Sequence, residues 1–252
     1  MKIYALMENI SHDECLACEH GLSLYIEADG KKILFDTGAS ENFAANAEKM
    51  GVDLKAVDFA AISHGHYDHG GGLAKFIEIN DHAPIYISNK GFNQYYSGTD
   101  FNVSIPEGLE GNPRFVLTSE PIKLSENITL LNCNDREAKY FADPYGLNKL
   151  VDGEFIPDDF LHEQYLIIEE NGKRIVISGC SHKGILNIME WLKPDILIGG
   201  FHFFRLTTEG EDAATLDKSA AILNEYGATY YTCHCTGTEQ YEYLKAQMPK
   251  LN

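Results

Sequence analysis

A dense cluster of histidines constrains this chain more than any other feature of its sequence. Three imidazoles, those of His64, His66 and His69, and the carboxylate of Asp68 directly follow the short apolar run 57–62, which predicts a buried strand. In an extended segment, residues two apart project to the same face, so His64 and His66 can share one metal ion, and a turn lets Asp68 and His69 reach a second. Imidazole and carboxylate ligands suit zinc, manganese or iron. The alternative is a cluster of histidines in a solvated turn.

Three further histidines directly follow apolar runs in the second half of the chain. These are His182, His202 and His234. The carboxyl ends of strands can direct side chains at one place, and a site for two metal ions needs more than four ligands. We therefore expect these residues to belong to the same site as the first cluster. Of the other histidines, His20 is a candidate to line the pocket, and we expect a surface position for His12, His82 and His162.

The pattern of apolar runs and turns predicts two similar halves. Each half opens with a hairpin, marked by Asp29-Gly30 and by Asn171-Gly172, and continues with alternating strands and helices. In the first half we expect helices at 41–50 and 73–79 and strands at 57–62 and 83–88. In the second we expect helices at 184–192 and 215–226 and strands at 195–199 and 229–232. Such halves predict two sheets that pack together and are covered by helices.

The segment 89–163 is rich in glycine, asparagine, aspartate and aromatic residues. Strands are expected at 114–117 and 128–131. The rest predicts long loops over the mouth of a pocket, because connections of this length are usually functional or disordered. A small hairpin subdomain with a core of aromatic side chains is the alternative. We expect one domain over 1–252, with 89–163 as a loop-rich insertion above the active site.

Composition narrows the classes of protein to consider. The chain has 252 residues, 44% of them hydrophobic, which is enough for a substantial core. Its 38 Asp and Glu against 20 Lys and Arg give a formal net charge of −18. This charge argues against binding to nucleic acid or to an anionic membrane, but it leaves room for a local cationic pocket. The apolar runs reach only strand length, so no membrane span is expected.

The cysteines indicate the compartment. Six cysteines without an N-terminal signal sequence are typical of thiols in a cytoplasmic protein. Cys15 and Cys18 with Cys233 and Cys235 can be read as a structural zinc site, or the first pair as a redox pair, but this spacing alone is weak evidence for either. We expect Cys180 to be a buried, inert thiol.

The motifs resemble those of the metallo-β-lactamase superfamily, whose hallmark is His-x-His-x-Asp-His after a strand. The resemblance spans nearly the whole chain and implies an αββα sandwich of two mixed sheets flanked by helices. Within the superfamily, the chain is similar to one branch. That branch includes many metal-dependent hydrolases and a synthase that joins a dihydropterin to a ribofuranosylaminobenzene phosphate. The segments that carry it are 19–23, 34–38, Asn46, 63–73, 179–182, 200–202 and 234–237.

The resemblance also implies a ligand set. His64 and His66 would hold the first metal ion, and Asp68, His69 and His234 the second. Where the superfamily commonly has a bridging aspartate, this chain has Cys180, so the number and identity of the metal ions stay open. We favour His182 as the substitute ligand, rather than His162, and place His202 in the substrate pocket.

These residues favour a cytoplasmic metal-dependent hydrolase. Two divalent ions, zinc before manganese or iron, would activate water for attack on a small-molecule ester, lactone, amide or phosphoester. Asp68 and His202 are the candidate catalytic residues. The substrate can be flat or phosphorylated, and a homo-oligomer is possible. The alternatives are a transferase that joins a dihydropterin-type pyrophosphate to an aromatic amine, and a non-catalytic metal-binding sensor.

Overall fold

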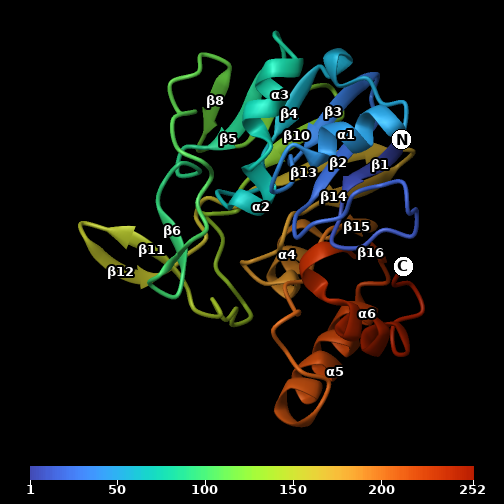
Figure 1. Cartoon of the computed structure of the whole chain (residues 1–252). Coiled ribbons are helices and arrows are strands. Elements are labelled where there is room, and N and C mark those ends of the chain that lie inside the picture. The colour runs from blue at the N-terminus through green and yellow to red at the C-terminus, as the bar shows by residue number, and fades with distance from the viewer.

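The computed structural model describes residues 1–252 (Figure 1). Its helices are α1 (Asn42–Lys49), α2 (Tyr67–Gly70), α3 (Leu73–Ile79), α4 (Ile185–Leu192), α5 (Gly210–Glu225) and α6 (Thr238–Lys245), with 3₁₀ turns at Leu54–Ala56 and His234–Thr236. Its strands are β1 (Lys2–Met7), β2 (Ser23–Ala28), β3 (Lys31–Phe35), β4 (Phe59–Ala61), β5 (Ile85–Ser88), β6 (Tyr95–Ser97), β7 (Phe101–Asn102), β8 (Phe115–Thr118), β9 (Ile122–Lys123), β10 (Ile128–Leu131), β11 (Leu147–Val151), β12 (Glu154–Pro157), β13 (Tyr165–Glu170), β14 (Lys173–Ile177), β15 (Ile196–Ile198) and β16 (Thr229–Tyr231).

Two six-stranded mixed sheets form the centre of the molecule. The first has the order β1-β2-β3-β4-β5-β8 and the second the order β16-β15-β14-β13-β10-β9. In the first sheet β3, β4, β5 and β8 run parallel, and in the second β14, β15 and β16 do. The remaining pairs are antiparallel. Both sheets therefore have a parallel part whose strands end at one edge.

Alternation along the strands produces three apolar layers. Leu34 packs against α1 and α3, whereas Ile33 and Phe35 on either side of it pack between the two sheets. In the second sheet Val176 packs against the C-terminal helices, and its neighbours again face the first sheet. The layers are thus helix, sheet, sheet and helix, and the predicted αββα sandwich is confirmed (Figure 1).

Both predicted hairpin turns form. Asp29 and Gly30 have φ angles of 49° and 70°, and Asn171 and Gly172 have 53° and 72°. Positive φ at both central residues is the geometry that a right-twisted hairpin needs, and Asx-Gly pairs adopt it at low cost. These turns fix the registers of β2 with β3 and of β13 with β14.

The segment 89–163 contains more regular structure than the sequence indicated. The strands β8 and β10 lie where they were expected and extend the two main sheets. The strands β6, β7, β11 and β12 form a separate four-stranded sheet that projects from the body in Figure 1. Tyr95 on β6 and Leu147 on β11 form a small buried cluster with Val103 and Phe160. Of the two expectations for this segment, the small hairpin subdomain is nearer to the structure than the long loops. The individual strands were not predicted because they are only two to five residues long.

The helices differ from the expectation at the C-terminal end. The helix α5 begins five residues before Thr215, and α6 was not predicted. A helical signal for α6 was present, since Tyr241, Leu244 and Met248 are spaced three and four residues apart and pack in the same core layer. None of the helices combines the length and apolar character that a bilayer crossing requires.

Candidate metal centre

The parallel strands of both sheets deliver the predicted site residues to one edge. The first sheet contributes Asp36 after β3 and the segment 63–70 after β4, and the second contributes the turns after β14, β15 and β16. The structure brings together all of the residues predicted as metal ligands, which form two neighbouring groups. The rings of His64 and His69 link the groups, with centroids 4.1 Å apart.

The first donor cluster consists of His64, His66 and His182. All three side chains are buried, and their ligand atoms lie within 4.8 Å of one another. The Nε2 atoms of His64 and His182 are 3.2 Å apart. Nε2 of His66 and Nδ1 of His182 have no hydrogen-bond partner. A buried polar atom without a partner is costly, so these nitrogens indicate a ligand that the protein itself does not provide.

The second donor cluster consists of Asp68, His69, Cys180 and His234. Nε2 of His69 is 3.1 Å from Sγ of Cys180 and 3.2 Å from Nε2 of His234. Oδ2 of Asp68 lies 3.3 Å from the same nitrogen of His234. A carboxylate, a thiol and two imidazoles thus converge on one point. The sequence-based expectation placed Cys180 outside the ligand set, whereas its sulfur lies within this group.

Oxygen atoms outside the cluster fix the rings of the second cluster. Asp36 is fully buried, and its Oδ2 lies 2.7 Å from Nδ1 of His69. The same carboxylate accepts hydrogen bonds from the amide and hydroxyl groups of Ser63. Asn9 does the equivalent for His234, with Oδ1 2.8 Å from Nδ1. Because Nδ1 is engaged in both rings, Nε2 is the atom presented to a metal ion.

Three consecutive buried residues, 162–164, support the first cluster by hydrogen bonds to the backbone of the segments that carry its ligands. Nδ1 of His162 accepts a hydrogen bond from the amide of Gly65, between two histidines of the cluster, at 2.8 Å. Glu163 accepts from the amides of His182 and Lys183 at 2.7 and 3.0 Å. The amide side chain of Gln164 donates to the carbonyl of Ile62, just before the cluster, at 2.7 Å.

The predicted surface position of His162 was therefore wrong. This residue has no exposed surface, and its Nε2 lies 3.0 Å from Oδ2 of Asp158 while Nδ1 bonds Gly65. Both ring nitrogens are thus used by the protein, and the ring stacks on Tyr95. Its polar loop setting, 158–163, gave no sign of this role. His12 and His82 are exposed, as expected.

Electrostatics differ between the clusters. Burial, reinforced by neighbouring imidazoles, lowers the pKa of His64 and His182 well below the usual value and that of His66 to about 3. Neutral imidazoles keep the lone pair that a metal ion needs. Burial also opposes charge on His69, but the carboxylates of Asp36 and Asp68 outweigh it and raise its pKa to about 9. The carboxylates of Asp36 and Asp68 thus favour positive charge at the second cluster.

Close approach of two loops requires glycine at the centre of the site. A Cβ atom on Gly179 would lie 2.3 Å from Oγ of Ser63, and one on Gly65 would lie 2.5 Å from the carbonyl oxygen of Gly91. In addition, Asp36, Ser181, His202 and His234 all have φ angles between 49° and 61°. Non-glycine residues in this region cost free energy and concentrate at functional sites.

The residues present fit divalent metal ions. The donors of the first cluster are imidazoles, and those of the second are imidazole, carboxylate and thiol, a set typical of zinc and also accepted by iron. Burial raises the pKa of the Cys180 thiol well above its usual value, so its thiolate requires a nearby cation. The unpartnered nitrogens of His66 and His182 carry the same implication.

An open pocket adjoins both clusters. His66, Asp68, Cys180, His182 and His234 line its base. Its rim comes from the small sheet and from the loop after β15, and consists of Tyr67, Ser97, Phe101, Val103, Leu147, Phe204 and Arg205. His20 also lines the pocket, with Nε2 3.4 Å from Oδ2 of Asp68. Ser97, Phe101, Val103 and Leu147 all belong to the segment 89–163, which therefore contributes to the wall of the pocket.

His202 lies at the wall of this pocket. It is 8% exposed, and neither of its ring nitrogens has a hydrogen-bond partner. Its ring centroid is 4.3 Å from that of His182, and it forms a third donor group with Cys180 and His182. The geometry accordingly allows His202 to face a substrate, as predicted, or to approach a metal ion.

The remaining cysteines do not form the structural zinc site considered from the sequence. Cys15 and Cys18 are exposed in the loop after β1, whereas Cys233 is half-buried and Cys235 is buried after β16. None of the four belongs to a donor cluster. None of the six cysteines forms a disulfide. Cys235 instead donates a hydrogen bond from Sγ to the carbonyl oxygen of Cys180 at 3.3 Å.

Comparison with known proteins agrees with this geometry. The sequence profile of the metallo-beta-lactamase superfamily matches residues 17–216, which include both clusters except His234. The chain belongs to this superfamily. Residue 216 lies within α5, so that the profile spans both central sheets except β1 and β16.

Individual relatives cover nearly the whole chain. A protein of Methanocaldococcus jannaschii, 7,8-dihydropterin-6-methyl-4-(beta-D-ribofuranosyl)-aminobenzene-5'-phosphate synthase, is 31% identical over 94% of this chain and 88% of its own. An uncharacterized protein of the same organism, MJ0448, is 29% identical over 93% and 90%. The crystal structure of Tm1679, a metal-dependent hydrolase of the beta-lactamase superfamily, superposes with a TM-score of 0.81 at 28% identity and covers 99% of this chain and 93% of that one.

Proposed function

We propose that this chain is a hydrolase of small-molecule esters, lactones, amides or phosphoesters that uses two divalent metal ions, with zinc preferred. The observation that carries the proposal is the presence of two adjacent buried donor clusters at the base of an open pocket. A structural metal site is closed, whereas a catalytic site leaves a coordination position toward substrate. The similarity to Tm1679, described as a metal-dependent hydrolase, supports the same reaction class.

The proposed ligands are the members of the two donor clusters. His64, His66 and His182 would hold one ion, and Asp68, His69 and His234 the other, with Cys180 added to the second set because of its 3.1 Å approach to His69. Bound divalent ions would supply Lewis acidity, which lowers the pKa of water and polarises the oxygen under attack.

The chain's own residues would then handle protons. In hydrolysis, a water oxygen bonds to the acyl carbon or phosphorus, the bond to the leaving atom breaks, and one proton moves from the water to that leaving atom. Asp68, at the base of the pocket, would orient the water. His202 is the proposed proton donor, because both of its ring nitrogens are free of protein partners. His20, beside Asp68, is the exposed imidazole of the site.

A transferase is the second candidate. The 31% identity to the dihydropterin synthase favours it, as does the aromatic rim of the pocket, since Phe101 and Phe204 are 57% and 39% exposed. Exposed rings of this kind suit stacking of a flat ligand. In such a reaction the aromatic amine, rather than water, would attack, and pyrophosphate would leave.

The deciding experiment combines metal analysis with turnover. Protein purified without added metal should contain one to two equivalents of zinc, iron or manganese, and a panel of nitrophenyl esters, lactones and phosphodiesters should include a substrate whose hydrolysis stops on chelation and returns with zinc. His202→Ala should lower the hydrolysis rate about 100-fold or more and leave the metal content unchanged. Metal-loaded protein that hydrolyses no member of the panel but joins a pterin pyrophosphate to an aromatic amine would decide for the transferase. Tightly bound metal without either reaction would indicate a sensor.

A further inference from the structure

The rim of the pocket contains one cationic side chain that has no ionic partner. Arg205 follows Phe204 on the loop after β15 and is exposed. Of the residues that line the pocket, it is the only lysine or arginine. Its guanidinium forms no ion pair, and its one hydrogen bond to another residue goes to the hydroxyl of Ser97 on β6, at 3.3 Å.

The other three arginines of the chain are committed to the fold. Arg114 donates to the carbonyl oxygens of Asn80 and Ile77, and Arg136 to that of Trp191. Arg174 pairs with Glu169 at 2.8 Å and also donates to a carbonyl oxygen. Arg205 differs from all three in that its one hydrogen bond to the protein goes to a hydroxyl, and no carbonyl or carboxylate oxygen accepts from its guanidinium.

The surroundings of Arg205 favour pairing with an anionic ligand rather than with an acidic side chain of the protein. Asp68 is the only acidic residue that lines the pocket, and its Oδ2 lies within 3.6 Å of ring nitrogens of His20, His69 and His234. In a chain of net charge −18, an anionic molecule is repelled from most of the surface. An unpaired guanidinium beside the donor clusters gives such a molecule one place to bind.

The phenylalanine rings near Arg205 indicate which chemical group of the ligand lies next to its anionic group. The guanidinium of Arg205 lies 5.4 Å from the ring centroid of Phe204, and Ser97, its hydrogen-bond partner, belongs to the same small sheet as Phe101. Both phenylalanines line the pocket. Arginine matches carboxylates and phosphates with two parallel N–H donors, and aromatic faces bind flat groups.

We propose that Arg205 is an anion-binding residue of the active-site pocket, and that the substrate carries a carboxylate or phosphate next to a flat, apolar group. The proposal rests on the proposed function of the same pocket. Arg205 would contact the anionic group, the rings of Phe101 and Phe204 would contact the flat group, and the bond to be cleaved would lie over the donor clusters. Arg205 sets specificity and takes no part in bond cleavage.

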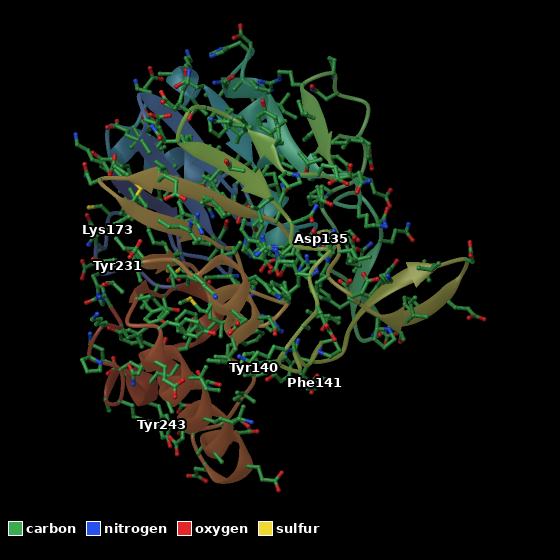
Figure 2. All side chains as sticks on the ribbon, turned by 180° about the vertical axis from the view of Figure 1, so that it is seen from behind. Asp135, Tyr140, Phe141, Lys173, Tyr231 and Tyr243 are labelled. Atoms are coloured by element: carbon green, nitrogen blue, oxygen red, sulfur yellow. The ribbon has the colours of Figure 1, made fainter.

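Calorimetric titration of the zinc-loaded protein with phenylphosphonate, benzoate and benzyl alcohol tests the proposal and compares the two kinds of anion. Arg205→Gln should weaken binding of the preferred anion roughly 10- to 100-fold, and Arg205→Lys should restore part of the loss. Benzyl alcohol, which has no charge, should bind wild type and both variants equally. Lys173→Gln is the matched control, because Lys173 is exposed at the amino end of β14, the end away from the site (Figure 2). Titration of metal-free protein isolates the contribution of the guanidinium from that of the ions.

Turnover distinguishes failure of this proposal from failure of the hydrolase. 4-Nitrophenyl hydrogen succinate carries a free carboxylate, so Arg205→Gln should raise its KM and leave its kcat nearly unchanged. 4-Nitrophenyl butyrate is the neutral control, and neither of its constants should change. Equal anion affinity in wild type and Arg205→Gln would overturn the anion site, even if both esters are hydrolysed. Arg205-dependent binding without hydrolysis of these esters or of any member of the substrate panel would retain the anion site and refute the hydrolase.

Discussion

The first donor cluster holds three imidazoles and no charged ligand, whereas the second combines a carboxylate, a thiol and two imidazoles. Their supports differ in the same way. In the second cluster, side-chain oxygens of Asp36 and Asn9 contact the ligand rings directly. In the first, Oγ of Ser63 contacts Nδ1 of His64 at 2.8 Å, but the other two ligands are supported differently. His162 and Glu163 hold the backbone amides of Gly65 and His182, and one ring nitrogen each of His66 and His182 has no protein partner.

This difference predicts how tightly each cluster would bind its metal ion. Side-chain contacts on the far nitrogen fix a ring and raise the basicity of the nitrogen that faces the metal. Backbone contacts fix the main chain of a ligand, but no protein group hydrogen-bonds the unpartnered ring nitrogens of His66 and His182. We therefore expect the second cluster to bind its ion more tightly, and the first to lose its ion at lower concentrations of chelator.

The largest effect is expected from removing a ligand of the first cluster. His66→Ala should lower the metal content from about two equivalents to about one and lower hydrolysis at least about 100-fold. The fold should persist, because three apolar layers exclude water independently of the metal. Elemental analysis, enzyme assay and circular dichroism measure these outcomes. The exposed His82→Ala is the control, and full metal content in His66→Ala would show that the first cluster is not a metal site.

A smaller effect is expected from Cys180→Ser, which changes only the chemistry of the second cluster. A thiolate binds zinc and cobalt well, and a serine hydroxyl is a poor ligand that does not ionise near neutral pH. The affinity of the second ion should fall about 10-fold or more, while the first ion stays. Cobalt-loaded wild type should show a sulfur-to-cobalt absorption band in the near ultraviolet, and the variant should lack it. Exposed Cys15→Ser should keep the band. A band that survives in Cys180→Ser would return Cys180 to the inert role expected from the sequence.

The sequence predicted the parts of the site that lie close together along the chain. Residues 64–69 and the strand-end positions of His182, His202 and His234 follow from local pattern, since a short apolar run followed by histidine marks the carboxyl end of a strand. The four layers could likewise be predicted, because each hairpin turn, strand and helix is marked by a pattern within fewer than twenty consecutive residues.

The supports of the ligands could not be predicted in this way. Gly65 and its partner His162 are 97 residues apart, and the partners Asn9 and His234 are 225 apart. A buried polar residue has the same sequence signature as one on the surface, and only the packed structure gives it a partner. The pairing of the small sheet could not be predicted for a related reason, because β6 pairs with β11, about fifty residues later in the chain.

The smallest effect is expected from Glu163→Gln, which tests whether support through the backbone matters to the first cluster. The carboxylate accepts hydrogen bonds from the amides of His182 and Lys183 and from the hydroxyl of Tyr165. The hydroxyl can turn and accept, but the amides cannot, so the side-chain NH₂ of glutamine must leave at least one bond unmade. A buried group that loses a partner costs about 1–3 kcal/mol, which should appear as a lower free energy of unfolding in urea.

The consequence for metal binding separates positioning from mere stability. If Glu163 fixes the turn that carries His182, chelator should remove the first ion from Glu163→Gln at about 10-fold lower concentration than from wild type, while the second ion and its cobalt–sulfur band stay unchanged. Glu154→Gln is the matched control, since Glu154 is exposed on β12. Lower stability with unaltered affinity for both ions would make Glu163 a structural residue alone. Loss of both ions together would show that the two clusters share one support, and that the contrast between them does not hold.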